Sequence, residues 1–447
     1  MSRLWPIALL VFVSACGSPQ PAAPSTATSG FPPAPAAPEG ALDAGTRQAL
    51  DRAWDALPEP DPADIAALGR SGDIRLAWLL SDLMRFSFAD QQAESTRLAL
   101  EELTGIDLPP VTGWVTAADH LIAWDTPAPP GYVSYKERLY TALDERWAPF
   151  FTEDSDIDHR LVSWGGVYID DRPPGDASRC LGCIPALDDP SVTDASGGDW
   201  YPDDRYVFGV EIGGEARAYP RNIMEVHEMV NDSLGGRRFA LPYCTLCGSA
   251  VLYFTDDLPQ PFGGPTLRTT GLLSRSNKIM YDVVTSSAFD TFTGRTVSGP
   301  LWEAGIELTR GTVITTTWGE WKAAHPDTTV VAFDAAGPRG YSLDPLGGRD
   351  DAGPIFPIGD RDPRLPVHEQ VIGVVDPEGT AIAFPVGPAT ARLRAGGVVG
   401  LGGVELRIEA GGLVAEYGGS AIPSSQSFWF AWSQFHSETL LWAPSAP

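Results

Sequence analysis

The fold of the longer, C-terminal part of the chain is decided by a stretch that reads Val207-Phe208-Gly209-Val210-Glu211-Ile212-Gly213-Gly214-Glu215-Ala216-Arg217-Ala218-Tyr219. Two strand-like runs flank a Gly-Gly pair, which predicts two antiparallel strands joined by a tight turn. The pattern partly recurs, since Val371-Ile372-Gly373-Val374 is followed by Ala383-Phe384-Pro385. Leu234-Gly235-Gly236 likewise recurs as Leu401-Gly402-Gly403. This echo suggests an internal duplication of a β-rich unit.

Outward from this stretch, the chain divides into regions of different texture. Apolar residues at helical spacing, such as those between Leu76 and Met84, predict a small helical domain over 46–126. Its layout resembles degenerate HEAT-type repeats. Residues 127–162 are interpreted as a connector, and glycine, proline and short β-branched runs predict a β-rich mixed domain over 163–447. We therefore expect an α+β protein.

Composition limits the classes of function. The chain has 447 residues, is 43% hydrophobic, and carries 31 basic against 58 acidic residues, which gives a net charge of −27. The apolar fraction is enough for a folded core and excludes uniform disorder. The negative charge argues against binding to nucleic acid, because such a surface repels phosphate backbones.

The N-terminus predicts export and lipid attachment. Arg3 precedes an apolar run over 4–13, and Ser14-Ala15 precede Cys16, which is the pattern of a signal peptide over 1–15. Its end resembles the bacterial lipobox, which implies cleavage before Cys16 and lipidation of that sulfur. Residues 16–45 are rich in Pro, Ala and Ser and predict a flexible linker. We expect a cell-envelope lipoprotein whose only membrane contact is this lipid. Gly17 favours the outer membrane, by resemblance to a known sorting rule.

The remaining four cysteines form two pairs, and the second pair is the more informative. Cys244-Thr245-Leu246-Cys247-Gly248 lies between two strand-like runs, as in the knuckle of a zinc ribbon. The spacing lets both sulfurs face one point, and Gly248 tolerates the positive φ that the turn requires. A thioredoxin-type pair would instead open a helix. The knuckle supplies two metal ligands, so zinc or copper would need others.

Three sources of further ligands are visible. Cys180 and Cys183 would give a tetrathiolate, while His227 or His436 would add an imidazole. Each has a structural alternative: a local disulfide between Cys180 and Cys183, histidines that only form hydrogen bonds, or a Cys244/Cys247 pair that is inert. If His227 is a ligand, Glu228, Asn231 and Asp232 are candidates to orient its ring.

From about Ser163 to Trp442 the chain resembles a bacterial and archaeal family known as domain of unknown function 3179. The resemblance rests on His227-Glu228-Met229-Val230-Asn231-Asp232, on Tyr243-Cys244-Thr245-Leu246-Cys247-Gly248-Ser249-Ala250, and on Trp429-Phe430-Ala431-Trp432. It implies no established activity, fold or cofactor. Cys180 and Cys183 lie in a loop that is longer than usual in that family, so the resemblance favours a local disulfide over a tetrathiolate.

The first functional expectation is a site for a soft metal, copper or zinc, with Cys244, Cys247, His227 and His436 as ligands. Two alternatives stay open: thiol–disulfide redox chemistry at Cys244 and Cys247, and a non-enzymatic envelope scaffold or binding protein. The sequence contains no phosphate-binding glycine loop, nucleophile elbow or HExxH motif, so no enzymatic activity is assigned.

Overall fold

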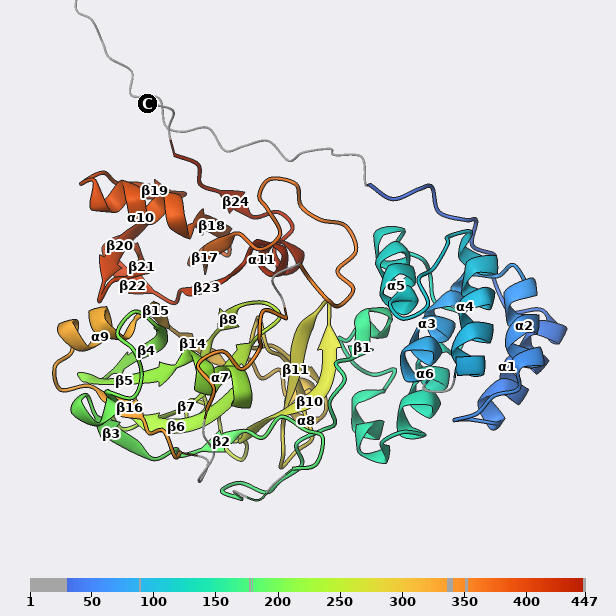
Figure 1. Ribbon diagram of the computed structural model, residues 1–447, viewed down its shortest axis with the longest axis horizontal. Helices are drawn as coiled ribbons and strands as arrows, with labels where there is room; N and C mark the ends of the chain where they lie inside the picture. Colours follow the sequence, from blue (N-terminus) through green and yellow to red (C-terminus); the bar gives the residue numbers. More distant parts are fainter. Residues whose placement is uncertain are drawn as a thin grey trace, which may run out of the picture.

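The computed structural model describes residues 30–87, 90–176, 178, 180–335, 341–349 and 353–444. Helices make up the N-terminal part and strands dominate the rest, as Figure 1 shows, so the predicted order of a helical region followed by a β-rich region is confirmed. The signal segment and Cys16 lie outside the described residues. Within the described ranges, no helix is both long and apolar enough to cross a membrane.

The helical region contains six α-helices, which are α1 (Ala44–Asp55), α2 (Pro62–Arg70), α3 (Ala77–Phe86), α4 (Asp90–Thr104), α5 (Gly113–Ala123) and α6 (Tyr132–Thr141). Two of them begin at an aspartate whose carboxylate accepts backbone N–H groups of the first turn: Asp43 for α1 and Asp61 for α2. Residues 127–162, which the sequence suggested were a connector, contain α6 and the short 3-10 helices Glu145–Phe150 and His159–Leu161. Tyr140 and Trp147 from this segment are buried in the same core as α1–α5.

The strands form five sheets, which we call blades 1 to 5. Blade 1 has the order β1 (Val162–Trp164), β10 (Leu267–Ser274), β11 (Asn277–Asp282), β12 (Ala288–Asp290), β13 (Thr296–Ser298). Blade 2 has the order β14 (Thr309–Gly311), β9 (Leu252–Phe254), β7 (Arg237–Cys244), β6 (Met229–Leu234), β2 (Leu187–Asp188), with β8 (Ser249–Ala250) paired to β7. Blade 3 has the order β15 (Ile314–Thr317), β4 (Tyr206–Ile212), β5 (Glu215–Pro220), β16 (Thr329–Val331), β3 (Val192–Asp194).

Blades 4 and 5 come from the C-terminal quarter of the chain. Blade 4 has the order β19 (Val399–Leu401), β20 (Val404–Glu409), β21 (Gly412–Tyr417), β22 (Ser420–Ile422). Blade 5 has the order β23 (Ser425–Phe428), β17 (Gln370–Val375), β18 (Ala381–Pro385), β24 (Leu440–Leu441). The helices among these strands are α7 (Arg221–His227), α8 (Pro300–Glu303), α9 (Trp318–Ala324), α10 (Val386–Arg394) and α11 (Trp429–Phe435).

The five blades surround a common centre, as in a five-bladed β-propeller. Strand contacts join blade 1 to 2 (β10 and β6), 2 to 3 (β6 and β5), 3 to 4 (β15 and β21) and 4 to 5 (β21 and β17). The ring closes where Phe292, after β12 of blade 1, packs on Trp432 of α11 with ring centroids 6.0 Å apart. The β-rich region is thus more regular than the mixed domain expected from sequence.

Blades 3 and 5 share one topology. Each has a central antiparallel hairpin, a strand paired antiparallel on one side, a seven-residue helix, and a short strand paired parallel on the other side. A glycine in each hairpin lies under a tryptophan of that helix: a Cβ at Gly209 would fall 2.3 Å from the Trp321 ring, and one at Gly373 would fall 2.1 Å from Trp432. The sequence echo therefore corresponds to two sheets built alike.

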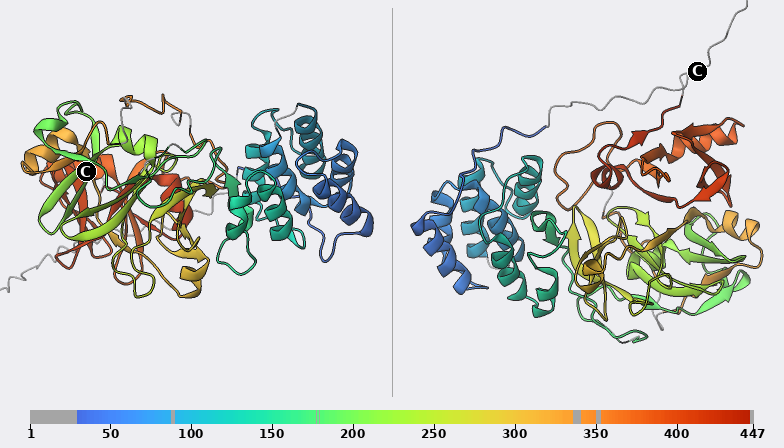
Figure 2. Two further views of the ribbon diagram at one scale, coloured as in Figure 1. Left: turned by 90° about the horizontal axis from the view of Figure 1, so that it is seen from below. Right: turned by 180° about the vertical axis from the view of Figure 1, so that it is seen from behind.

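The helical region packs against blade 1, beside β1 in both views of Figure 2. Lys136 of α6 is fully buried at this junction and pairs with Asp82 of α3 at 2.8 Å. Its ammonium also donates to the carbonyl of Val162 in β1 at 2.6 Å. Because the charge is paired and hydrogen-bonded on both sides, it ties the two regions together.

Candidate functional site

The Cys244–Cys247 turn follows β7 of blade 2 and contacts blade 5. Strand β7 ends at Cys244, and β8 pairs back on it with Cys244 opposite Ser249. Gly248 has φ +60°, and a Cβ there would lie 2.9 Å from the Phe428 ring of blade 5. The N–H of Phe428 donates to the carbonyl of Cys247 at 2.8 Å. The strand–turn–strand form predicted for this segment is present, and blade 5 closes over it.

Both cysteines of the turn are free thiols and are almost fully buried, at 1% and 0% exposure. Burial alone would raise the pKa of Cys244, but a hydrogen bond from Cys247 and the charge of Lys278 outweigh burial, so the pKa of Cys244 is lowered. Burial and the bond to Cys244 raise the pKa of Cys247 well above its usual value. Loss of a proton is therefore easier at Cys244 than at Cys247.

Lys278 of β11 is the cation of this site. Its ammonium donates to the carbonyl of Tyr243 at 2.8 Å and, by a short bond, to the carbonyl of Glu228. It also lies 3.6 Å from the Glu228 carboxylate. Burial lowers the pKa of Lys278, and Glu228 and Cys244 oppose that effect. Lys278 was not among the predicted site residues. It is one of only three lysines and precedes the apolar run Ile279-Met280-Tyr281, a pattern that indicates a buried charge.

Glu228 connects Lys278 to the turn itself. It has φ 53°, in the left-handed region, at the C-terminal end of α7. Its carboxylate accepts a hydrogen bond from the Thr245 hydroxyl at 2.9 Å, and Arg349 donates to that same hydroxyl at 2.9 Å. Sequence reasoning expected Glu228 to orient an imidazole, but its partners are Thr245 and Lys278.

The tip of the β10–β11 hairpin covers Cys247. Cys247 Sγ lies 3.5 Å from the carbonyl oxygen of Ser276 and 3.6 Å from the side-chain oxygen of Asn277, so these oxygens and Cys244 Sγ are alternative acceptors for its single S–H. Ser276 and Asn277 are 2% and 1% exposed, and Ser276 Oγ and Asn277 Nδ2 find no hydrogen-bond partner among the described residues. The two residues that contact Cys247 thus each carry a buried donor that has no partner in the described ranges.

His227 is engaged elsewhere. Its Nδ1 lies 2.6 Å from the carbonyl of Pro185 and its Nε2 lies 2.7 Å from the Tyr341 hydroxyl. Both ring nitrogens therefore have hydrogen-bond partners at the end of α7. The neighbouring candidates also act as ties between strands: Asn231 bonds Asp188 at 2.9 Å, and Asp232 pairs with Arg217 at 2.6 Å.

His436 lies at the end of α11, with its ring 4.2 Å from that of Trp432. Burial, with a smaller effect from the charge of Arg310, lowers the pKa of His436 to about 4. Among the described residues, three or more His, Cys, Asp or Glu ligand atoms come within 4.8 Å of one another only at Asp170, Cys180 and Cys183. The expected ligand set of Cys244, Cys247, His227 and His436 is not assembled in this structure.

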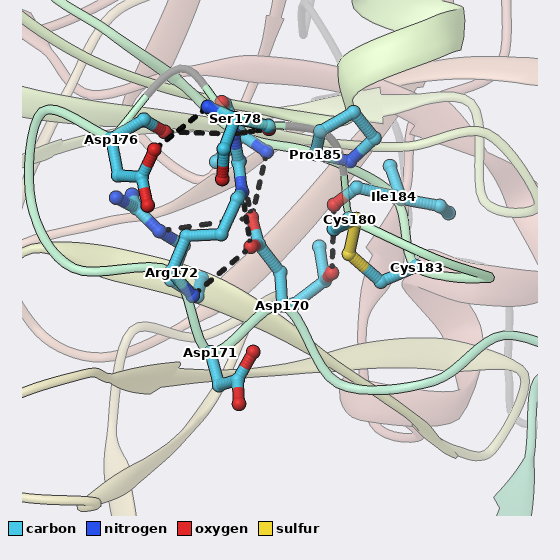
Figure 3. Close-up of polar contacts among 12 residues, drawn as sticks. Asp170, Asp171, Arg172, Asp176, Ser178, Cys180, Cys183, Ile184 and Pro185 are labelled. Atoms are coloured by element: carbon cyan, nitrogen blue, oxygen red, sulfur yellow. Dashed lines mark hydrogen bonds and ion pairs between the residues drawn. A yellow bond between two sulfur atoms is a disulfide. The ribbon is translucent and has the colours of Figure 1, made fainter.

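Cys180 and Cys183 are joined by a disulfide in the loop that Figure 3 shows. Both are partly exposed, and Leu181 between them is 91% exposed. Asp170 beside them is fully buried, and its carboxylate is held by Arg172 at 2.6 and 2.7 Å and by the N–H of Ala186 at 2.9 Å. The bond between the two sulfurs removes them from a tetrathiolate with Cys244 and Cys247, and the Asp170 oxygens are already occupied.

Comparison with known proteins gives a family but no activity. Residues 181–408 match the family described as protein of unknown function (DUF3179). The chain belongs to this family. No match was found among curated proteins or among solved structures.

The DUF3179 match separates the candidate residues into two groups. It contains the Cys244–Cys247 turn, His227 and Lys278. It ends before His436 and before the strands β23 and β24 that complete blade 5. The buried dithiol and its lysine therefore lie wholly within the part of the chain that defines the family.

Proposed function

We propose that this DUF3179 protein is a thiol–disulfide redox protein whose reactive pair is Cys244 and Cys247. The observation that carries the proposal is the hydrogen bond between the two thiols beside the buried ammonium of Lys278. A stabilised thiolate next to a protonated thiol is the arrangement that dithiol exchange requires. Zinc would need about four ligands, and the turn supplies two.

The exchange balances in two steps. The Cys244 thiolate attacks one sulfur of a small disulfide, which releases one thiolate and leaves a mixed disulfide on Cys244. Cys247 then loses its proton and displaces the second thiolate, which closes the Cys244–Cys247 disulfide. Two electrons pass from the protein to the small disulfide. Closure of the disulfide leaves no buried thiolate, and Lys278 and Glu228 remain as an opposed pair of charges beside it.

A second candidate is a soft monovalent metal held by the two sulfurs alone. It is favoured by the same ammonium, because Lys278 would offset part of the negative charge of a bis-thiolate. Copper(I) accepts soft thiolate ligands and fits this candidate better than zinc does.

Export and lipid attachment at Cys16 are also part of the proposal. The signal pattern over 1–15 and the lipobox resemblance support them, and a disulfide at Cys180–Cys183 is typical of oxidising compartments outside the cytosol. Radiolabelled palmitate should enter the wild-type protein in cells and should not enter Cys16→Ser. Equal labelling of both would contradict the anchor.

We further propose that blades 3 and 5 descend from one duplicated unit.

The redox proposal is tested in a Cys180→Ser/Cys183→Ser background, which leaves two thiols in the folded domain. The protein is equilibrated with glutathione buffers of graded potential, and free thiols are counted by mass after alkylation in denaturant. We expect reversible, two-thiol oxidation that is lost in Cys244→Ser. Metal content is measured on the same samples. Thiols that stay reduced in every buffer refute redox function, and one equivalent of copper lost in Cys244→Ser establishes the second candidate instead.

A further inference from the structure

The identity of the oxidant follows from where the thiolate lies, given the redox function proposed above. In disulfide exchange, both sulfurs of the disulfide must lie in line with the attacking sulfur, and each of them carries a bulky substituent. Cys244 is 1% exposed, and blade 5 and the β10–β11 tip cover the turn. Only Leu246 and Gly248 of the turn are partly exposed. A molecule of two or three heavy atoms needs a far smaller opening of the turn than a disulfide does.

We propose that the oxidant of the Cys244–Cys247 dithiol is a small hydroperoxide, with hydrogen peroxide as the best-fitting member of that class. The site provides a nucleophilic sulfur, a second thiol to resolve the product, and unsatisfied hydrogen-bond donors for peroxide oxygen. These three features occur together at the Cys244–Cys247 turn.

The unsatisfied donors are the part of the site that disulfide exchange does not use. Within the described part of the chain, Ser276 Oγ and Asn277 Nδ2 are buried without partners, and each of these residues has a carbonyl oxygen within hydrogen-bond distance of Cys247 Sγ. Negative charge builds on the outgoing oxygen when an O–O bond breaks. Fixed donors in a site that excludes water stabilise such charge most effectively. Lys278 adds a positive charge on the Cys244 side.

The reaction balances without another cofactor. The Cys244 thiolate attacks one oxygen of hydrogen peroxide, the O–O bond breaks, and the departing hydroxide takes up a proton to leave as water. Cys244 is then a sulfenic acid. The Cys247 thiol attacks that sulfur, a second water leaves, and the disulfide forms. Two equivalents of a thiol then reduce the disulfide, and this slower step needs the wider opening of the turn that a mixed disulfide requires.

The test again uses the Cys180→Ser/Cys183→Ser background, reduced and freed of reductant. One equivalent of hydrogen peroxide should convert both thiols to a disulfide. The rate should exceed that of free cysteine at the same pH about tenfold or more, because a fixed hydrogen-bond donor stabilises the charge on the departing oxygen. In an added Cys247→Ser variant, dimedone should trap a sulfenic acid on Cys244. Cumene hydroperoxide, which is bulkier, should react more slowly than hydrogen peroxide, and an equal or greater rate would overturn the size argument.

Substitutions at Ser276 and Asn277 test whether these residues donate to the peroxide. Glutathione disulfide, as a second oxidant, distinguishes failure of the peroxide inference from failure of the redox function. Ser276→Ala and Asn277→Ala should slow the peroxide reaction, each about tenfold or more, while circular dichroism confirms folding. The matched control is Ser298→Ala, since Ser298 is also a buried serine of blade 1 with an unpartnered hydroxyl and lies on β13. If glutathione disulfide oxidises the pair but hydrogen peroxide is no faster than with free cysteine, the redox function stands and the peroxide inference fails. If neither oxidises it, both fail.

Discussion

Replacement of Lys278 by methionine tests whether a buried cation sustains the dithiol site. The ammonium bonds two carbonyls, those of Tyr243 and Glu228, and lies 3.6 Å from the Glu228 carboxylate. A hydrogen bond from a charged donor contributes about 1.5–3 kcal/mol, and removal of one partner of a buried ion pair costs about 3–5 kcal/mol. Methionine fills most of the volume of the lysine side chain, so the loss should come from the missing charge and its hydrogen bonds. We expect Lys278→Met to lower the free energy of unfolding by about 3–5 kcal/mol.

The same variant should change the chemistry of Cys244. Loss of the positive charge removes one of the three effects that lower the pKa of this thiol, so its pKa should rise. Urea unfolding followed by tryptophan fluorescence measures the stability, and the pH dependence of iodoacetamide labelling in the Cys180→Ser/Cys183→Ser background measures the thiol.

Lys322→Met is the matched control for this pair of measurements. Lys322 also pairs with an aspartate, Asp203, at 2.7 Å, but the two side chains are 27% and 67% exposed. An ion pair of that kind contributes about 0–1 kcal/mol. Equal losses of stability in Lys278→Met and Lys322→Met, or an unchanged labelling profile of Cys244, would refute the role given to Lys278.

Three further predictions concern other parts of the molecule. The pKa of His436 is 6.5 in the unfolded chain and about 4 in the folded protein, so the unfolded chain takes up a proton first as the pH falls. The free energy of unfolding should therefore fall by about 3 kcal/mol between pH 6.5 and pH 4. His436→Phe should remove that fall, as measured by unfolding at a series of pH values. Gly373→Ala should cost about 1–3 kcal/mol or more by overpacking the tryptophan above it. Gly387→Ala, with open space around it, should change the urea midpoint by less than about 1 kcal/mol. Cys180→Ser/Cys183→Ser should lose at most about 2–3 kcal/mol in thermal unfolding, because the loop that the disulfide closes is short.

Local patterns predicted the elements of the fold well. The Gly213-Gly214 hairpin has the expected register, with Ile212 opposite Glu215. The Cys244–Gly248 segment is the expected tight turn between strands. These features are decided by neighbours in sequence: glycines that accept positive φ and alternating apolar residues. The arrangement of five sheets around one centre depends on contacts between distant segments, and no local pattern specifies those.

The candidate site was predicted only in part for the same reason. Cys244 and Cys247 share one turn, so their proximity follows from spacing. His227 is 17 residues from Cys244 in sequence, but Pro185 and Tyr341 hold its ring nitrogens. Lys278 reaches the turn from blade 1, and its proximity to Cys244 depends on how two sheets pack. A search for lysines in otherwise apolar strands would have found it.

The order in which strands enter blade 5 affects how the chain can be made. The β17–β18 hairpin receives its two neighbours, β23 and β24, from residues 425–441, which are synthesised after the hairpin itself. While the ribosome is still adding those residues, both edges of the nascent hairpin are unpaired and open to association with other chains. A premature stop codon after Phe435 would leave out β24 entirely. The loss of that one short strand would therefore leave one edge of blade 5 unpaired.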